Sequence, residues 1–394
     1  MPVLLALLLV GCSLDAPSDP TDTVNSAVPT EATSQFVAVG NSLTAGYMDS
    51  GLMKTGQANS FPMLVATQMG LDNSSFTQPW VKSPGIGSTD LHDDTLVAGV
   101  LHYTGSTVLP LGQTLKDEVP SKLLLAAAQL TPYHNLGVPG ALTYELMNTH
   151  SPETSVGAAF DSPNPFFGFI NRSGALFGNA SIPADPETQA PAYETASQFG
   201  QALAKGAVLT SVFIGGNDFL RAATSGEPIG HPALTDPTDW ATYYGTFVGG
   251  YAGGINKRNG FKSDIIVTTL PNVANIPYFL DIADFSAVFE SQVTWDKEET
   301  GVEYVLITDF LSWFMDNLGG TIPAAMTLDA GEVTFLDGRI NAYNGAIQAT
   351  IANPQVAAMA YFGVIDINEA LSALDAEKTQ HFLYLRAIHA NESI

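Results

Sequence analysis

Residues 36–47 read FVAVGNSLTAGY, a short apolar run that ends at Gly40 and is followed by Ser42. The run 36–39 is β-prone and predicts a buried strand. Comparable apolar runs recur at 208–214, 264–269 and 359–365. Helix-length segments lie between these runs, at 61–68, 193–205, 240–256 and 339–351. The alternation predicts a parallel sheet covered by helices on both faces, with its chemistry at the carboxyl ends of the strands.

The composition indicates a folded and strongly acidic protein. The chain has 394 residues, of which 45% are hydrophobic and 10% aromatic, too many buriable side chains for a disordered chain. Its 39 Asp and Glu against 14 Lys and Arg give a formal charge of −25. Because this charge repels phosphate backbones, nucleic acids and other anionic polymers are poor candidates as partners. The length allows two or three domains, and one elaborated α/β domain fits as well.

The first residues resemble a bacterial lipoprotein signal. Residues 3–10 form an apolar run too short to span a bilayer, and the run ends in Leu9-Val10-Gly11-Cys12. This ending is similar to a lipobox, in which Cys12 becomes the lipidated N-terminus. The residue after Cys12 is not Asp, so the resemblance implies a cell-envelope protein anchored at the outer membrane. An ordinary signal peptide with an incidental cysteine, and hence secretion, is the alternative.

The predicted organisation is therefore a signal at 1–12, a flexible linker rich in Pro, Ser, Thr and Asp at 13–34, and one folded domain at 35–394. Two long stretches near 72–121 and 151–188 lack regular periodicity and predict loop insertions. The second contains Phe166-Phe167-Gly168-Phe169, which is either part of an acyl pocket or a satellite core.

Four separate stretches supply the residue types needed for acyl transfer. Ser42 follows the first strand and opens a helix, so it is either a nucleophile at the sheet rim or a helix N-cap. The segment 135–140 ends in Gly140, whose backbone N–H is unobstructed by a side chain, and Asn217 follows the strand predicted at 208–214. His389 offers an imidazole as general base.

In these four blocks the chain resembles the SGNH (GDSL-type) hydrolases. The blocks are Gly40-Asn41-Ser42-Leu43, 135–140, Gly215-Gly216-Asn217-Asp218 and the surroundings of His389. The resemblance implies a flavodoxin-like three-layer α/β/α sandwich that hydrolyses lipid esters, aryl esters or acetylated sugars without a metal or organic cofactor. It assigns Ser42 as nucleophile and His389 as base. It places the oxyanion hole at the Ser42 N–H, the Gly140 N–H and the Asn217 amide.

Two positions depart from the family pattern. Asn41 stands where the family has Asp, a mild change because Asn makes similar turn hydrogen bonds. Arg386 stands where the family has the Asp that orients the imidazole, and a cation there opposes the imidazolium formed in catalysis.

Three accounts of Arg386 remain open. A backbone carbonyl orients His389 in a Ser-His dyad, or another carboxylate replaces the missing acid, the candidates being Asp366, Glu369 and Asp375. In the third account the protein is a weakened relative that binds lipid or carbohydrate at the cell surface. His381 is a rival base, and no spacing among the other histidines suggests a metal site.

Overall fold

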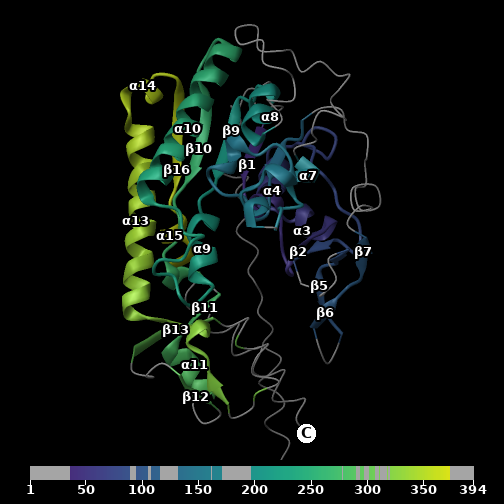
Figure 1. The fold of residues 1–394 in the computed structure, drawn as a ribbon. Helices are drawn as coiled ribbons and strands as arrows, with labels where there is room; N and C mark the ends of the chain where they lie inside the picture. Colours follow the sequence, from purple (N-terminus) through teal and green to yellow (C-terminus); the bar gives the residue numbers. More distant parts are fainter. Residues whose placement is uncertain are drawn as a thin grey trace, which may run out of the picture.

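The computed structural model describes residues 36–88, 95–104, 108–115, 132–160, 162–170, 197–276, 278–289, 293–296, 301–306, 310, 317 and 320–372. Its centre is a five-stranded, all-parallel sheet in the order β16-β10-β9-β1-β8 (Figure 1). The strands are β1 (Phe36–Gly40), β8 (Asn135–Gly137), β9 (Leu209–Phe213), β10 (Ser263–Thr268) and β16 (Ala360–Ile365). Numbered along the chain, the order is 2-1-3-4-5, which is the doubly wound order of flavodoxin-like sheets.

Four of the five strands confirm the sequence prediction, and β8 is an addition to it. The predicted runs at 208–214 and 264–269 differ from β9 and β10 by one residue at each end, and the run at 359–365 differs from β16 by one residue at its start. β8 is only three residues long and pairs with the end of β1, Gly137 opposite Gly40.

Helices cover both faces of the sheet, as the alternation predicts. Phe36 and Ala38 of β1 share an apolar cluster with Ala66 of α4 (Phe61–Gln68). Val37 and Val39 point the other way, into the main core with α8 (Gln198–Lys205), α10 (Pro237–Asn259) and α13 (Ala330–Ala352). The chain is therefore an α/β protein whose layers are compatible with a three-layer sandwich.

The two longest helices begin earlier than periodicity predicts because their caps lie upstream. The Asp236 side chain accepts from the Thr238 N–H, and Pro237 occupies the first turn of α10. α13 starts with a capping box in which Asp329 and Glu332 accept from each other's N–H groups at 2.9 and 2.8 Å. The prediction placed the start of this helix at 339, nine residues too late.

The remaining elements are short. The helices are α2 (Ser42–Ala45), α3 (Lys54–Ala58), α6 (Glu145–Asn148), α7 (Phe167–Ile170), α9 (Asn217–Ala223), α11 (Ile282–Phe289), α14 (Pro354–Ala357) and α15 (Ile367–Ser372), with 3-10 turns at Pro152–Thr154, Val156–Phe160, Val273–Asn275 and Ala324–Met326. The predicted insertion near 72–121 contains antiparallel pairs of β4 (Leu96–Ala98) with β7 (Gln113–Leu115) and of β5 (Leu101–Tyr103) with β6 (Val108–Pro110). β2 (Gly51–Leu52) pairs with β3 (Ile86–Gly87).

A small second sheet between β10 and α13 is absent from the sequence prediction. The strands β11 (Phe279–Asp281), β13 (Val302–Leu306) and β15 (Thr327–Asp329) are antiparallel, and β12 (Thr294–Trp295) pairs with β14 (Thr321–Ile322). A separate apolar cluster forms under α11, where the rings of Phe285 and Phe310 meet at 4.7 Å.

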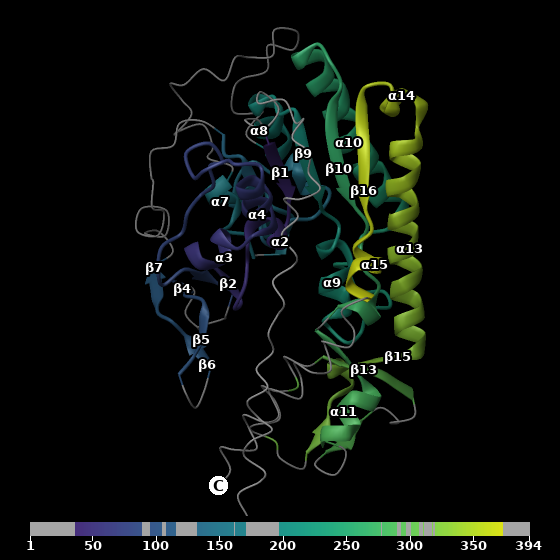
Figure 2. The same cartoon turned by 180° about the vertical axis from the view of Figure 1, so that it is seen from behind.

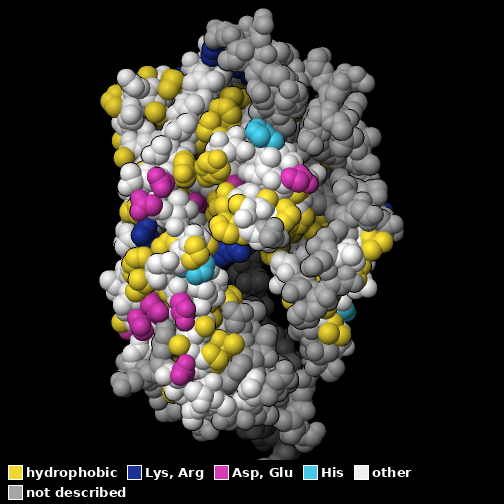
Figure 3. All heavy atoms as spheres, in the orientation of Figure 1, with side chains coloured by type: hydrophobic (Ala, Val, Ile, Leu, Met, Phe, Trp, Pro, Cys, Tyr) yellow, Lys and Arg dark blue, Asp and Glu magenta, His cyan; other side chains and the backbone are white. Residues whose placement is uncertain are grey.

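The face drawn in Figure 3 shows acidic side chains scattered among neutral ones, with basic side chains sparse. Within the described ranges, none of the helices combines the length and the hydropathy that a bilayer crossing requires.

Candidate active site

The ends of three neighbouring strands bring the predicted oxyanion donors to one edge of the sheet. Gly40, the last residue of β1, is in register with Gly137 of β8 and with Phe213 of β9. The Val138 N–H donates to the Gly40 carbonyl at 3.0 Å, and the Asn41 N–H donates to the Phe213 carbonyl at 3.3 Å. The chain segments that carry Ser42, Gly140 and Asn217 thus leave the sheet side by side.

Ser42 begins α2, but Asn41 is its N-cap. The Asn41 side-chain oxygen accepts from the Leu43 N–H at 3.2 Å, so the hydroxyl of Ser42 is not used for capping. Ser42 is half-buried, and its hydroxyl makes no hydrogen bond to any described residue. α2 is a single turn, too short for a large macrodipole, so the Ser42 N–H acts as an individual donor without an intrahelical acceptor.

Gly140 lies in a loop in which the carbonyls of the preceding and the following residue both accept side-chain hydrogen bonds. Its φ is +79°, the left-handed region that favours glycine. Asn164 donates to the Pro139 carbonyl at 2.8 Å, and the Asn217 side-chain amide donates to the Ala141 carbonyl at 2.9 Å. Among the described residues no acceptor meets the Gly140 N–H, and the residue is exposed. The loop thus presents an open backbone donor.

Asn217 is the first residue of α9, and its side chain binds the loop that carries Gly140. One hydrogen of its amide is donated to the Ala141 carbonyl, and the second has no acceptor among the described residues. The contact holds the Gly140 loop to α9 and fixes the position of the amide.

Two buried carboxylates, Asp218 and Glu145, accept hydrogen bonds from the backbone that follows Gly140. Asp218 accepts from the Thr143 N–H at 3.0 Å, from the Thr143 hydroxyl at 2.9 Å and from the Thr235 hydroxyl at 2.8 Å. Burial raises the pKa of Asp218 to about 6. Glu145 accepts from the Leu142 and Val156 N–H groups, and burial raises its pKa as well. Asp218 therefore supports the rim of the sheet.

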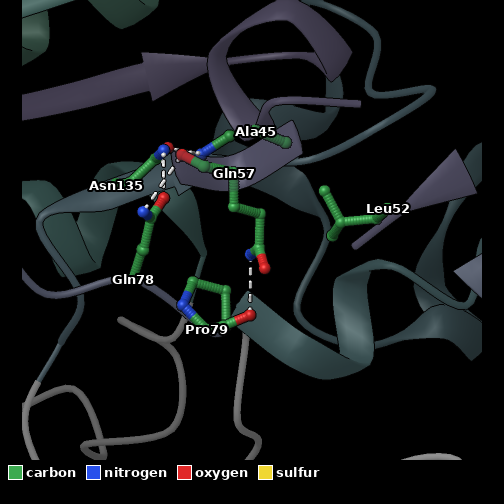
Figure 4. A pocket seen from close by; sticks show the side chains of 7 residues that line it. Ala45, Leu52, Gln57, Gln78, Pro79 and Asn135 are labelled. Atoms are coloured by element: carbon green, nitrogen blue, oxygen red, sulfur yellow. Dashed lines mark hydrogen bonds between the residues drawn. The ribbon is translucent and has the colours of Figure 1, made fainter. Parts of the chain in front are cut away.

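A network of buried Asn and Gln side chains holds α2 and the end of β1 in place (Figure 4). Asn135 donates to the Thr44 carbonyl at 2.9 Å and to the Gln78 side chain at 3.0 Å. Gln57 donates to the Pro79 carbonyl at 2.8 Å. Gln198, fully buried, donates to the Gly40 carbonyl at 2.9 Å and so ties α8 to the end of β1. Sequence patterns miss these supporting residues because their partners lie far away along the chain.

The predicted base and several of its alternatives lie outside the described residues. The predicted base His389, the rival base His381 and the candidate acid Asp375 are not described. Arg386, Cys12 and the rest of the predicted signal and linker are also outside the described residues. Of the two described alternative acids, Asp366 directly follows β16 and Glu369 lies in α15. The Asp366 side chain accepts from the Thr269 hydroxyl at 3.0 Å and from the Glu369 N–H at 3.1 Å.

His134 is excluded as the base by its position. It precedes β8, at the amino edge of the sheet, while Ser42 lies at the carboxyl edge. Its Nδ1 accepts from the Thr77 N–H at 3.0 Å, and burial lowers its pKa to about 4. Within the described ranges no group of His, Cys, Asp and Glu is arranged to hold a metal ion.

The aromatic stretch at 166–169 has a core position where it is described. Phe166 and Phe167 are buried in the main core, and the Phe166 ring meets the Tyr47 ring edge-on at 6.1 Å. The side chain of Phe169 is outside the described set.

Comparison of the chain with protein-family models, with curated proteins and with solved structures finds no match. Its function is therefore inferred from the residues and geometry of the site.

Proposed function

We propose that the protein is an SGNH-type serine hydrolase that cleaves carboxylic esters through an acyl-enzyme on Ser42. The observation that carries this proposal is that the segments carrying Ser42, Gly140 and Asn217 leave the sheet at one edge, and that the Ser42 hydroxyl bonds no described residue. The proposed oxyanion donors are the N–H groups of Ser42 and Gly140 and the free amide hydrogen of Asn217. The strand order adds support, because doubly wound sheets bind ligands where the order reverses, here between β1 and β9.

In the proposed reaction, Ser42 Oγ attacks the ester carbonyl carbon while His389 takes the hydroxyl proton. The carbonyl oxygen becomes an oxyanion that the three donors stabilise, each by about 3 kcal/mol. Collapse of this intermediate breaks the bond to the alcohol, which leaves with the proton from His389. Water then attacks the acyl-serine by the same route, releases the acid and restores Ser42.

The cellular part of the proposal follows from the sequence. A lipid on Cys12 would anchor the enzyme at the cell envelope, and residues 13–34 would tether the domain to that anchor. The substrate is then a lipid or other ester within reach of the membrane.

A second candidate function is a surface protein that binds lipid or carbohydrate without efficient chemistry. One sequence observation favours it, the presence of Arg386 where the resemblance implies an acid. Loss of the triad acid costs about 10⁴ in turnover in serine proteases, which is the expected damage if nothing replaces it.

The proposed function predicts that Ser42→Ala abolishes hydrolysis of p-nitrophenyl butyrate because the acyl group then has no acceptor. Ser74→Ala, at an exposed serine whose hydroxyl binds Asp72, is the matched control and should keep full activity. Circular dichroism should show the same melting temperature for Ser42→Ala and the parent. Unchanged turnover in a folded Ser42→Ala protein would reject the proposal.

A further inference from the structure

An apolar groove of about 550 Å³ opens next to α2 on the α4 side of the sheet. Leu43, the residue after the proposed nucleophile, lines it together with Phe61 and Val65 of α4. In Figure 2, β10 and β16 are seen with α4 on one side and α13 on the other.

The floor of the groove is a row of residues across three strand ends. Thr268 of β10 is in register with Ile365 of β16. On the other side of β10, Val267 is in register with Val212 of β9. The next residue of β9, Phe213, therefore lies beside Thr268 and continues the row. Because Phe213 is in register with Gly40, this row lies level with the end of β1, two residues before Ser42.

The described lining carries no charged side chain, although the whole chain has a net charge of −25. Its polar side chains already have protein partners. The Tyr47 hydroxyl is 2.6 Å from Ser88 Oγ, Asn59 donates to the Thr55 carbonyl, and Ser60 donates to the Gln57 carbonyl. The lining therefore offers little to the hydroxyl groups of a sugar and suits a neutral, apolar ligand.

Several large apolar side chains of the groove are open to solvent. Leu43 is 55% exposed, Met48 45% and Ile365 47%. A contiguous apolar surface of this kind is typical of a binding site, since covering it releases water from apolar atoms.

We propose that the groove receives the acyl chain of the ester, so that the substrate class is an ester of a medium or long fatty acid. This inference rests on the proposed function of Ser42. An acyl group bonded to Ser42 Oγ begins one residue from Leu43, which lines the groove, and its methylenes can extend along the row toward Ile365. Esters of acetic acid leave the groove empty and gain nothing from it.

The test compares kcat/KM for p-nitrophenyl acetate, butyrate and octanoate with the full chain. Each methylene buried in the groove should raise kcat/KM by about fourfold. Val65→Trp places a bulky ring in the groove and should lower the ratio of octanoate to acetate kcat/KM by about tenfold or more. Leu64→Trp is the matched control, because Leu64 is the exposed neighbour of Val65 on α4 and is not part of the lining.

A milder variant covers the case in which Val65→Trp does not fold. Ile365→Thr keeps a β-branched side chain on β16 and should lower the ratio of octanoate to acetate turnover about threefold. Calorimetric titration of Ser42→Ala with ethyl octanoate gives a readout without turnover, in which Val65→Trp should abolish binding and Leu64→Trp should retain it.

A flat chain-length profile with Ser42-dependent acetate turnover would overturn the acyl groove and leave the proposed function standing. An equal loss of acetate and octanoate turnover in an Ile365→Thr protein that keeps the parent's melting temperature would also overturn it. If the parent protein shows no Ser42-dependent hydrolysis of any of the three esters but still binds ethyl octanoate, the result would count against the hydrolase. It would instead support the groove as a lipid-binding site.

Discussion

At the scale of single residues, the buried carboxylate of Asp218 links the loops around the proposed oxyanion hole. It accepts hydrogen bonds from Thr143, in the loop after Gly140, and from Thr235, just before α10. Its neighbour Asn217 binds the same loop through Ala141. The two adjacent side chains therefore fix the distance between α9 and Gly140, so the proposed site depends on a titratable group that is fully buried.

The raised pKa of Asp218 predicts a specific pH dependence of stability. Its pKa is about 6 in the folded protein against an ordinary value of 3.8, so the folded state binds the proton more tightly than the unfolded state. This contribution to the free energy of unfolding is fully present below about pH 4 and is lost as the pH rises through 6. The expected loss is roughly 3 kcal/mol.

Urea unfolding between pH 4 and 7 measures this effect in the parent and in Asp218→Asn. An amide at this position can still accept from Thr143 and donate to Thr235, and it does not titrate. The difference in unfolding free energy between the two proteins should therefore change by about 2 kcal/mol across the range, which is most of the expected loss. Parallel stability curves would show that Asp218 has an ordinary pKa in the folded protein.

At the scale of elements, the position of Ser42 depends on how closely α2 approaches β8. A Cβ atom added to Gly137 would lie 2.3 Å from the Ala45 backbone nitrogen, a distance that real contacts do not allow. Asn135, at the other end of β8, donates to the carbonyl of Thr44 in the same turn. β8 thus acts as the support of the single turn that carries the proposed nucleophile.

Gly137→Ala is accordingly expected to displace α2. We expect a loss of about 2 kcal/mol in unfolding free energy, as for overpacked cores, together with a fall in ester turnover. Gly338→Ala in α13 is the control, because its added Cβ meets nothing within 4 Å, and it should not destabilise the protein. Urea unfolding and p-nitrophenyl butyrate turnover check both variants; equal stability of the two would contradict this role of β8.

The elements also show where sequence reasoning succeeds and where it stops. The apolar runs that became β1, β9, β10 and β16 are recognisable because buried parallel strands are continuously hydrophobic. β8 begins with Asn135 and ends with Gly137, residues that disfavour strands, and it forms because it pairs with β1. The small sheet of β11, β13 and β15 has the same origin in pairing between segments far apart along the chain.

At the scale of the whole molecule, the doubly wound strand order explains why three distant sequence blocks were predictable as neighbours at one edge of the sheet. Parallel strands share a carboxyl edge, so residues that follow strand ends meet there irrespective of their separation along the chain. The groove was not predictable in this way. Its floor joins the ends of β9, β10 and β16, and its wall is α4, so it depends on register and helix packing.

The central claim is that Ser42 is an activated nucleophile, and labelling with a fluorophosphonate followed by peptide mass mapping tests it most directly. The phosphonyl group should be found on the peptide that contains Ser42, and it should be absent from Ser42→Ala while Ser74→Ala is labelled as fully as the parent. A folded parent protein that stays unlabelled, or that carries the label on a different serine, would contradict the account.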